Sequence, residues 1–430
     1  MRSRSGSRPS DRGGRGPREP RHSQDTAAPR AARGERHHAA TTGGETAVVN
    51  RRGAQRVRRG HPWVFRSDIE RFPALPAGVV RVEESNGAPL GWAQWSPASE
   101  IALRHIERDS TRVVDAGWWH ARLTAALRRR ESLAPHANAY RLVHGEGDGL
   151  PSLVVDRYDE WLVVQLLSAG LETQREHILA SLRELTGCRG ILARNDVASR
   201  EREGLPRNVE LLYGEVPRTV EVLEHGVRYL AAPWDGQKTG AFLDQRENRV
   251  LVGQVARGRA LDCFAYHGSF ALHLAQRADH VTALDISAPA LARVAEHAAR
   301  NNLQNIDAVE GDAFDVLRAW HREGRQFDTI VVDPPAFAKS RAALDGALRG
   351  YKDINLQAMK VLAPGGTLFT ASCSHHLSRG LFFEMLQEAV GDSGRRFALR
   401  AFTGQPVDHP EIIGIPETGY LKGAVLESMD

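Results

Sequence analysis

The sequence is poor in cysteine and contains no long apolar run. Cys188, Cys263 and Cys373 are far apart in a chain of 430 residues. They form neither CxxC pairs nor a dense disulfide framework, so we expect free thiols in a reducing compartment and no metal site. No apolar stretch approaches the roughly 20 residues that cross a bilayer, and the first thirty residues lack the apolar segment of a secretory signal. These absences predict a cytoplasmic protein with no membrane partner.

Positive charge is concentrated at the start of the chain. The formal net charge is +4, but residues 1–46 hold ten Arg against five Asp and Glu, which leaves about −1 for the remainder. This segment is rich in Arg, Gly, Pro and Ser and has almost no large apolar side chain, so we expect it to be disordered. Its role stays open between an electrostatic RNA anchor and an incidental extension.

A second basic feature follows this tail. Five arginines fall within ten residues, directly before the segment at 61–65 (HPWVF): Arg51, Arg52, Arg56, Arg58 and Arg59. Arginine clusters attract phosphate, and aromatic side chains can stack on bases. The alternatives are a solvated basic strand face and core positions for Trp63 and Phe65. We predict RNA contacts for Arg51, Arg52, Arg58, Arg59 and Trp63.

Three patterns of apolar residues divide the rest of the chain. Residues 47–110 contain short strands and turns that indicate a small β domain, with strands at 47–49, 78–83, 90–95 and 101–106. Residues 111–223 indicate a central α+β domain, with helices at 118–130 and 172–185 and strands at 142–155, 161–167 and 190–193. The glycines of this domain at 145, 147 and 149 are more typical of a hairpin-like turn than of a phosphate loop, because no helix follows.

From residue 224 to 430 strands alternate with helices, as a doubly wound parallel sheet requires. The expected strands are 259–263, 280–285, 306–310, 329–333 and 367–371, and the expected helices are 269–277, 288–301, 313–322 and 354–362. We therefore predict an α/β protein with a Rossmann-like C-terminal domain. Its site should lie where these strands end.

The first of these strands leads into a tight turn and a helix at 261–270 (LDCFAYHGSF). The turn has one glycine, Gly268, and is not a GxGxxG sequence. A dinucleotide such as NAD remains an alternative ligand, but its pyrophosphate favours a glycine-rich loop. S-adenosylmethionine has no phosphate and fits this turn better. The candidate cofactor contacts here are Asp262, Phe264, Tyr266 and Gly268.

Acidic residues end the next three expected strands. Asp285 lies about twenty residues beyond the turn, where a carboxylate can accept both ribose hydroxyl hydrogens. Asp312 is placed to reach an adenine amino group, and Asp333 ends the following strand. One such Asp is more often a helix cap, whereas three in succession favour an adenosine-containing ligand.

Two segments suggest chemistry on a nucleobase, 333–337 (DPPAF) and 371–376 (ASCSHH). Pro334 and Pro335 stiffen a loop in which Asp333 can pair with the edge of a flipped base and Phe337 can stack on its face. Cys373 should emerge at the same edge as Asp333. A thiolate can add to C6 of cytosine and so activate C5, which is itself a poor nucleophile.

The other cysteines, Cys188 and Cys263, we interpret as buried inert thiols. His375 and His376 follow Cys373 and could tune it, although surface histidines are commoner.

Six segments together resemble the large-subunit ribosomal RNA 5-methylcytosine methyltransferases: 60–65 (GHPWVF), 146–151 (EGDGLP), 238–249 (KTGAFLDQRENR), 333–335 (DPP), 372–374 (SCS) and 416–422 (PETGYLK). That family has an N-terminal PUA domain, a central α+β domain and a C-terminal Rossmann-like methyltransferase domain. The resemblance covers nearly everything from residue 47 onward. It implies S-adenosylmethionine as cofactor and 23S ribosomal RNA as partner, and it leaves a homodimer open.

By this resemblance Cys373 is the nucleophile and Asp333 assists at the cytosine ring. Asp262, Asp285 and Asp312 line the cofactor site, and a loop covers it: Phe242, Asp244, Gln245 and Arg246. An alternative for the loop is a structural network of Arg246 with Asp244. His267 departs from the pattern, because a small hydroxyl residue is expected before Gly268.

Two rival functions remain. A methyltransferase of another specificity, such as a guanine N-methylating enzyme, needs no thiol. A non-catalytic ribosome-assembly factor would use the PUA-like domain and merely retain the cofactor fold.

Overall fold

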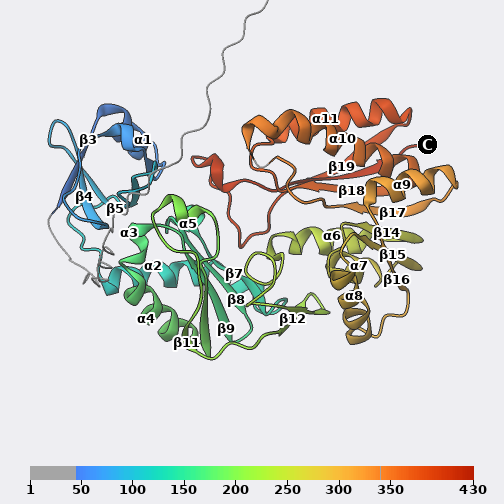
Figure 1. Ribbon diagram of the computed structural model, residues 1–430, viewed down its shortest axis with the longest axis horizontal. Coiled ribbons are helices and arrows are strands. Elements are labelled where there is room, and N and C mark those ends of the chain that lie inside the picture. The colour runs from blue at the N-terminus through green and yellow to red at the C-terminus, as the bar shows by residue number, and fades with distance from the viewer. Residues whose placement is uncertain (1–44, 339) are drawn as a thin grey trace, which may run out of the picture. The chain divides into compact units, whose positions relative to one another are not determined.

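The computed structural model describes residues 45–338 and 340–430, so the predicted disorder of the tail lies outside the described residues except at its last two positions. The described residues contain four β-sheets (Figure 1). No helix among them combines the length and the apolar character that a bilayer span demands.

The first sheet has the strand order β2-β6-β5-β4-β1-β3. Its strands are β1 (Thr46–Val49), β2 (Trp63–Val64), β3 (Ile69–Arg71), β4 (Gly78–Glu84), β5 (Pro89–Trp95) and β6 (Leu103–Glu107). The basic cluster forms helix α1 (Arg51–Arg58), so the alternative of a basic strand face is wrong. The side chain of Asn50 caps this helix by accepting a hydrogen bond from the Gly53 amide at 3.0 Å.

The second sheet has the order β11-β10-β9-β8-β7. Its strands are β7 (Ala139–His144), β8 (Leu153–Tyr158), β9 (Trp161–Leu166), β10 (Gly190–Arg194) and β11 (Val209–Gly214). The single strand expected at 142–155 is instead two antiparallel strands, because residues Gly145–Asp148 form a short 3-10 turn. The glycines there make a turn, as predicted.

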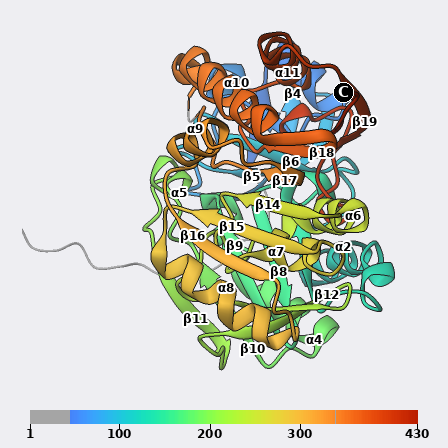
Figure 2. The ribbon, with the colours of Figure 1, turned by 90° about the vertical axis from the view of Figure 1, so that its right-hand side faces the viewer.

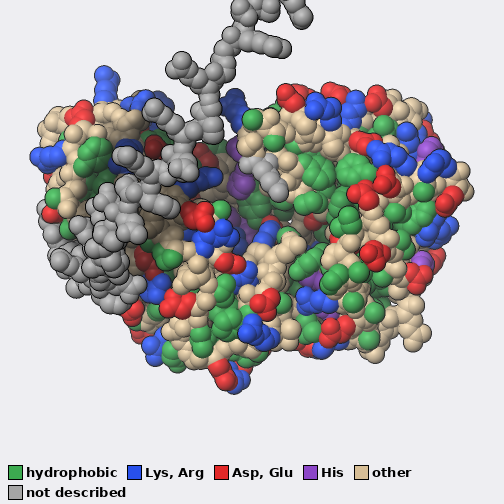
Figure 3. All heavy atoms as spheres, viewed as in Figure 1, with side chains coloured by type: hydrophobic (Ala, Val, Ile, Leu, Met, Phe, Trp, Pro, Cys, Tyr) green, Lys and Arg blue, Asp and Glu red, His purple; other side chains and the backbone are tan. Residues whose placement is uncertain are grey.

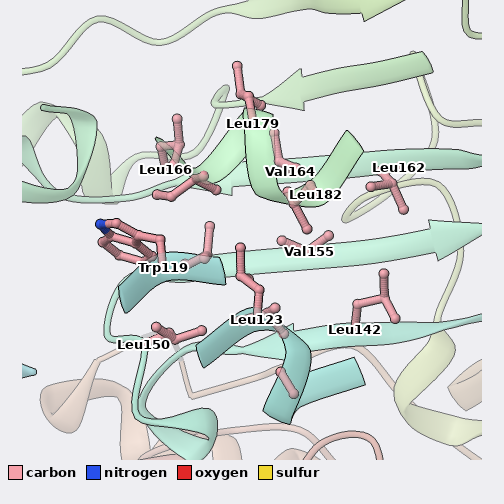
Figure 4. Close-up of a cluster of buried hydrophobic side chains, with 14 of the residues drawn as sticks. Trp119, Leu123, Leu142, Leu150, Val155, Leu162, Val164, Leu166, Leu179 and Leu182 are labelled. Atoms are coloured by element: carbon pink, nitrogen blue, oxygen red, sulfur yellow. The ribbon is translucent and has the colours of Figure 1, made fainter. Parts of the chain in front are cut away.

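Helices α2 (Ala116–Arg128) and α4 (Arg175–Thr186) cover one face of this second sheet. The short helix α3 (Ala169–Glu172) lies against β4 and β5 of the first sheet, and α5 (Ser199–Arg202) follows β10. Figure 4 shows Trp119 and Leu123 of α2 and Leu182 of α4 lying against Val155 and Val164 of the strands. Fully burying one such Leu or Val contributes roughly 1.5–3 kcal/mol relative to leaving it exposed.

A separate hairpin joins this region to the last sheet. Its antiparallel strands are β12 (Val220–Glu224) and β13 (Val227–Ala231). The boundary predicted after residue 223 falls inside β12. A division that keeps the hairpin whole therefore lies before Val220.

The last sheet has the order β16-β15-β14-β17-β18-β20-β19, most of which can be followed in Figure 2. Its strands are β14 (Arg259–Cys263), β15 (His280–Asp285), β16 (Ile306–Glu310), β17 (Phe327–Val332), β18 (Leu362–Ser372), β19 (Phe397–Thr403) and β20 (Lys422–Ser428). All run parallel except β20, which pairs antiparallel with β18 and β19. The expected doubly wound sheet is present, with β20 as an antiparallel addition.

Both faces of this sheet are covered, which explains its nearly continuous apolar strands. Along β17, Ile330 and Val332 pack with α9 (Ala313–Arg322), α10 (Leu344–Val361) and α11 (Arg379–Ser393). Val331 points to the opposite face and packs with α6 (Arg246–Val255), α7 (Ser269–Leu274) and α8 (Ala288–Arg300). Figure 1 shows these two helical layers. The strand order reverses between β14 and β17, where ligands bind in open α/β sheets.

Candidate active site

The loop after β14 has a strained backbone. Phe264 and Tyr266 have positive φ angles of 62° and 51°, and Gly268 has 84°. A Cβ at Gly268 would also meet Val294 at 3.1 Å, so this position requires glycine. Strain of this kind concentrates at ligand sites because it costs about 1–3 kcal/mol per residue.

Asp285 holds this loop in place. One of its carboxylate oxygens accepts from the Tyr266 amide and the other from the Ser287 amide, both at 2.8 Å. Each oxygen keeps a further lone pair for a ligand hydroxyl. Asp312 is exposed and caps α9 by accepting from the Phe314 amide at 2.8 Å. The capping explanation therefore applies to Asp312, while its second oxygen bonds nothing in the described part of the chain.

Asp262 is more deeply buried than Asp285 and Asp312. Its carboxyl group is buried and accepts from the Ala271 amide at 2.9 Å. Burial, with the charges of Asp333 and Asp285 nearby, raises its pKa well above the usual value. A role for Asp262 at the cofactor stays a prediction.

Asp333 and Cys373 emerge at the same edge of the sheet, as predicted. They follow the neighbouring parallel strands β17 and β18, in which Val332 pairs with Thr370. The hydroxyl of Tyr351 on α10 joins the two loops: it bonds the Ser374 hydroxyl at 2.8 Å and accepts from the Phe337 amide at 3.3 Å.

The environment of Cys373 does not favour a preformed thiolate. The residue is partly buried. Burial, followed by the carboxylates of Asp333 and Asp244, raises the pKa of its thiol to about 11. Burial and the Asp244 carboxylate likewise raise the pKa of Asp333 to about 7, although a hydrogen bond from Gln245 opposes this rise. At neutral pH the thiol is therefore protonated, and Asp333 is able to exist in its neutral form.

The predicted loop over the cofactor brings Asp244 and Gln245 to this edge. The hydroxyl of Tyr420 donates to the buried carboxylate of Asp244 at 2.7 Å, and Lys238 forms an ion pair with it. These partners hold the pKa of Asp244 well below its usual range despite burial. Its second oxygen is buried without a partner among the described residues, so it can receive a cationic or donating ligand. Phe242 lies edge-on to Tyr266, with ring centroids 5.5 Å apart.

Arg246 differs from its loop neighbours. Its guanidinium is fully buried and bonds both carboxylate oxygens of Asp408, at 3.0 and 2.7 Å. The structural network considered for Arg246 is thus real, but its partner is Asp408 instead of Asp244. Because both terminal guanidinium nitrogens bond Asp408, Arg246 stabilises the loop from the protein interior.

His267, the residue that departs from the family pattern, does not present its side chain at the surface of the site. Its side chain is buried and packs against Tyr229 and His297, with ring centroids 5.4 and 5.3 Å away. Burial lowers its pKa well below the usual value, so the ring is neutral. His375 and His376 are exposed, and the ring of His375 lies 5.2 Å from that of Tyr420.

The predicted RNA contacts have varied surroundings. Arg52 pairs with Asp68 and Arg58 with Glu84, whereas Arg51 and Arg59 are exposed and pair with no carboxylate among the described residues. Trp63 is half-buried, and its indole nitrogen donates to Glu146 at 2.8 Å, which reduces its freedom to stack. Basic and acidic side chains are interspersed on the part of the face that is visible in Figure 3.

Of the three residues after Asp333 that we predicted to contact RNA, Pro334, Pro335 and Phe337, only Pro335 is exposed. Pro334 is buried. Phe337 is half-buried and packs on Tyr351, with ring centroids 4.6 Å apart, so only part of the ring can face a base.

Several residues at this edge were missed from the sequence: Ile286, Tyr351, Asp408, Tyr420, Lys238 and Lys422. Lys238, Tyr420 and Lys422 lie in segments that carry the family resemblance, which is the signal that could have found them. Tyr351 and Asp408 have partners elsewhere in the chain, Ser374 and Arg246, and Ile286 is an exposed apolar residue with no motif of its own.

Comparison with known proteins identifies the family. Residues 140–410 match the S-adenosylmethionine-dependent methyltransferase family, and residues 47–108 match a PUA-like domain. The chain is 40% identical to the ribosomal RNA large subunit methyltransferase I of Aeromonas hydrophila over 86% of its own length and 96% of the relative's. The chain belongs to the ribosomal RNA large subunit methyltransferase I family. It is an S-adenosylmethionine-dependent methyltransferase with a PUA-like domain.

Other relatives and solved structures agree with this assignment. The family member from Shewanella amazonensis is 40% identical over 85% of this chain and 95% of its own. A Streptococcus mutans protein described as a SAM-dependent methyltransferase superposes with a TM-score of 0.75 at 22% identity, covering 89% of this chain and 99% of its own. The structure of SMU.776, solved with SAH, gives 0.76 at 21% identity over the same shares. These structural likenesses show the shared fold.

The residues at the sheet edge fit S-adenosylmethionine, which supplies a methyl group on a sulfonium sulfur when bound. Asp285 has acceptor capacity left for hydroxyl groups, and Asp244 presents an oxygen to which no described residue bonds. Ile286 directly follows Asp285 and is 70% exposed, so it offers apolar surface to a purine ring. The 264–268 loop brings backbone close without a phosphate-binding glycine pattern.

Proposed function

We propose that this methyltransferase modifies C5 of a cytosine in large-subunit (23S) ribosomal RNA through a covalent Cys373 adduct. The observation that carries the proposal is the shared edge of Asp333 and Cys373, next to the strained cofactor loop. The relatives are named for large-subunit ribosomal RNA, and this name supplies the substrate class. The PUA-like domain would add contacts to the same RNA.

The chemistry follows from the nature of the cytosine ring. The sulfur of Cys373 forms a bond to C6, and the electrons of the C5–C6 double bond make C5 nucleophilic enough to accept the methyl group. The proton on C5 then leaves to solvent, the S–C6 bond breaks, and the thiolate is restored. Overall, the cytosine ring gains one methyl group and releases one proton.

We further propose that Asp333 assists at the ring. A carboxyl group with a pKa of about 7 can be neutral or charged near physiological pH, so it can donate to or accept from the polar edge of cytosine. For the cofactor we propose contacts from Phe264, Tyr266 and Gly268 by the loop backbone, and from Asp262, Asp285 and Asp312 by their carboxyl groups.

Nucleoside analysis tests the proposal. The full chain is incubated with tritiated S-adenosylmethionine and unmodified ribosomal RNA, and the labelled nucleosides are separated. We expect 5-methylcytidine from the wild type and a loss of at least 100-fold with Cys373→Ala. A labelled guanosine with unchanged turnover of Cys373→Ala would support the guanine N-methylating rival. Absence of S-adenosylmethionine binding by calorimetry would support the assembly factor.

A further inference from the structure

Helix α8 bonds the backbone of strand β13 through side chains spaced one helical turn apart. Among the described strands β13 pairs only with β12, so its other edge needs partners. The guanidinium of Arg293 donates to the Leu230 carbonyl, and the Asn301 side chain accepts from the Arg228 amide at 2.8 Å. Between them, the Leu230 amide donates to His297 Nε2 at 3.1 Å. The four-residue spacing puts these three side chains on one face of α8, where they act as the second partner of the strand.

His297 also bonds the cofactor loop, residues 264–268, through the other nitrogen of its ring. The distance from His297 Nδ1 to the backbone carbonyl oxygen of His267 is 2.9 Å. Other bonds to this loop come from β15: the Ala265 amide donates to the Leu284 carbonyl at 3.0 Å, and the Tyr266 amide donates to Asp285. The loop is therefore held from two sides, by β15 and by α8.

The two partners of His297 determine where its proton lies. A backbone amide can only donate a hydrogen bond and a carbonyl can only accept one, so Nε2 carries no proton and Nδ1 carries one. An imidazolium has a proton on both nitrogens and would lose the bond to Leu230. Burial, together with the Arg293 charge, lowers the pKa of His297 to about 4. The ring is therefore neutral at physiological pH and can form both bonds.

The same face of α8 limits the position of the loop at a second point. Val294, three residues before His297, would lie 3.1 Å from a Cβ at Gly268. This contact limits how closely the loop approaches the helix, and the bond from His297 prevents it from moving away. Tyr266, with a positive φ of 51°, directly precedes the bonded carbonyl. A backbone conformation of this kind persists only where its surroundings hold it.

We infer that His297 is a positioning residue for methyl transfer: its neutral ring ties the cofactor loop to the β12–β13 hairpin and so keeps the loop in the shape that binds S-adenosylmethionine. This inference rests on the proposed function, in which residues 264–268 contact the cofactor. The side chain of His297 is 0% exposed, so it acts on the cofactor only through the loop.

Three substitutions separate the two bonds of His297. The side-chain nitrogen of asparagine is as many bonds from Cα as Nδ1 is, so His297→Asn keeps a donor for the loop and loses the bond to Leu230. The side-chain oxygen of glutamine is as far along the chain as Nε2, so His297→Gln keeps an acceptor for Leu230 and loses the bond to the loop. His297→Leu loses both bonds.

Calorimetry with S-adenosylmethionine, on the full chain and without RNA, tests the inference. A loop that is less often in its binding shape lowers the apparent affinity in proportion. We expect His297→Gln and His297→Leu to bind about five- to tenfold more weakly than the wild type, as the loss of one buried hydrogen bond predicts. His297→Asn should bind within about twofold of the wild type. Because the Asn and Gln variants each lose one bond, their urea unfolding midpoints should be similar.

His321→Gln is the matched control, because His321 is an exposed histidine on α9. Its affinity and unfolding midpoint should equal those of the wild type. Equal affinities of His297→Asn and His297→Gln overturn the inference, since a purely structural histidine would give no such difference. If His297→Gln fails to fold, as circular dichroism would show, His297→Asn decides: binding within twofold supports the inference, and binding tenfold weaker overturns it.

Gly268→Ala separates this inference from the proposed function. The added Cβ would meet Val294, so this variant should bind S-adenosylmethionine weakly if the loop contacts the cofactor. Unchanged binding by Gly268→Ala would mean that the proposed cofactor loop is wrong. Weakened binding by Gly268→Ala with unchanged binding by His297→Gln would mean that the inference about His297 fails alone.

Discussion

At the scale of single residues, the most informative group is the Cys373 sulfur. Cytosine carrying fluorine at C5 cannot release a proton from that carbon, so the S–C6 bond should persist once it forms. We expect wild-type enzyme, cofactor and 5-fluorocytidine-substituted ribosomal RNA to yield a complex that survives denaturing electrophoresis. Cys373→Ser should yield none, while its S-adenosylmethionine affinity stays within about threefold. A persistent complex with Cys373→Ser would place the nucleophile elsewhere.

Asp333 allows a prediction with a defined sign. Its carboxyl group has a raised pKa of about 7, so it is charged above that pH and neutral below it. Only the charged form raises the pKa of Cys373. Alkylation of Cys373 in Asp333→Asn should therefore match the wild type below about pH 7 and become faster above it.

Methyl transfer by Asp333→Asn should fall by about 100-fold or more, because an amide cannot exchange a proton with the ring as we propose for the carboxyl group. Faster alkylation with slower methylation separates the electrostatic effect from the catalytic one. Parallel changes in both rates would contradict this assignment.

At the scale of secondary-structure elements, Tyr351 on α10 joins the loops after β17 and β18. Tyr351→Phe removes its bonds to Ser374 and to the Phe337 amide but keeps the buried ring. We expect a stability loss of about 1–3 kcal/mol in urea unfolding and a kcat about tenfold lower, because Asp333 and Cys373 lose their fixed separation. Tyr213→Phe is the matched control, because the Tyr213 ring stacks under Arg183 on the central sheet. An unchanged kcat for Tyr351→Phe would show that the loops hold their positions without this bond.

The elements that could be predicted are those with local signals. β14, β15 and β16 match their predicted bounds, because each is a short apolar run between turn and helix signals. β20 was missed, since Lys422–Ser428 follows a long loop and pairs with β18, which lies more than fifty residues earlier. Asp333 and Cys373 could be predicted because strand ends are visible in the sequence. The Arg246–Asp408 pair could not, because its members are 162 positions apart.

At the scale of the whole molecule, Asp408 links distant parts of the chain. Its carboxylate accepts from Arg246 and from the Arg141 amide, and its backbone carbonyl accepts from Arg130. Asp408→Asn leaves the Arg246 charge buried without a partner, and we expect a loss of about 3–5 kcal/mol in urea unfolding at pH 7.

The pH dependence of this effect has a defined direction. The pKa of Asp408 is far below its usual range, because its ion-pair partners outweigh burial. Its contribution is thus complete above the unfolded value of about 4 and is lost as the pH falls below it. The difference in stability between Asp408→Asn and the wild type should therefore begin to narrow as the pH falls below about 4. Asp235→Asn, at an exposed pair with Arg218, should stay within about 0.5 kcal/mol of the wild type.

RNA binding is also a property of the whole molecule, and the ion pairs of α1 determine which arginines matter most. Arg58 already has a carboxylate partner, whereas Arg51 and Arg59 pair with none in the described residues. Each phosphate contact contributes about 0.7–0.9 to the slope of log affinity against log salt. The double variant Arg51→Ala, Arg59→Ala should lower the slope by about 1.4–1.8 for a ribosomal RNA fragment between 50 and 200 mM salt, and Arg58→Ala by less than half of that. Equal slopes for the wild type, the double variant and Arg58→Ala would mean that the RNA binds to another surface. Side chains that contact no phosphate cannot change the number of counterions released.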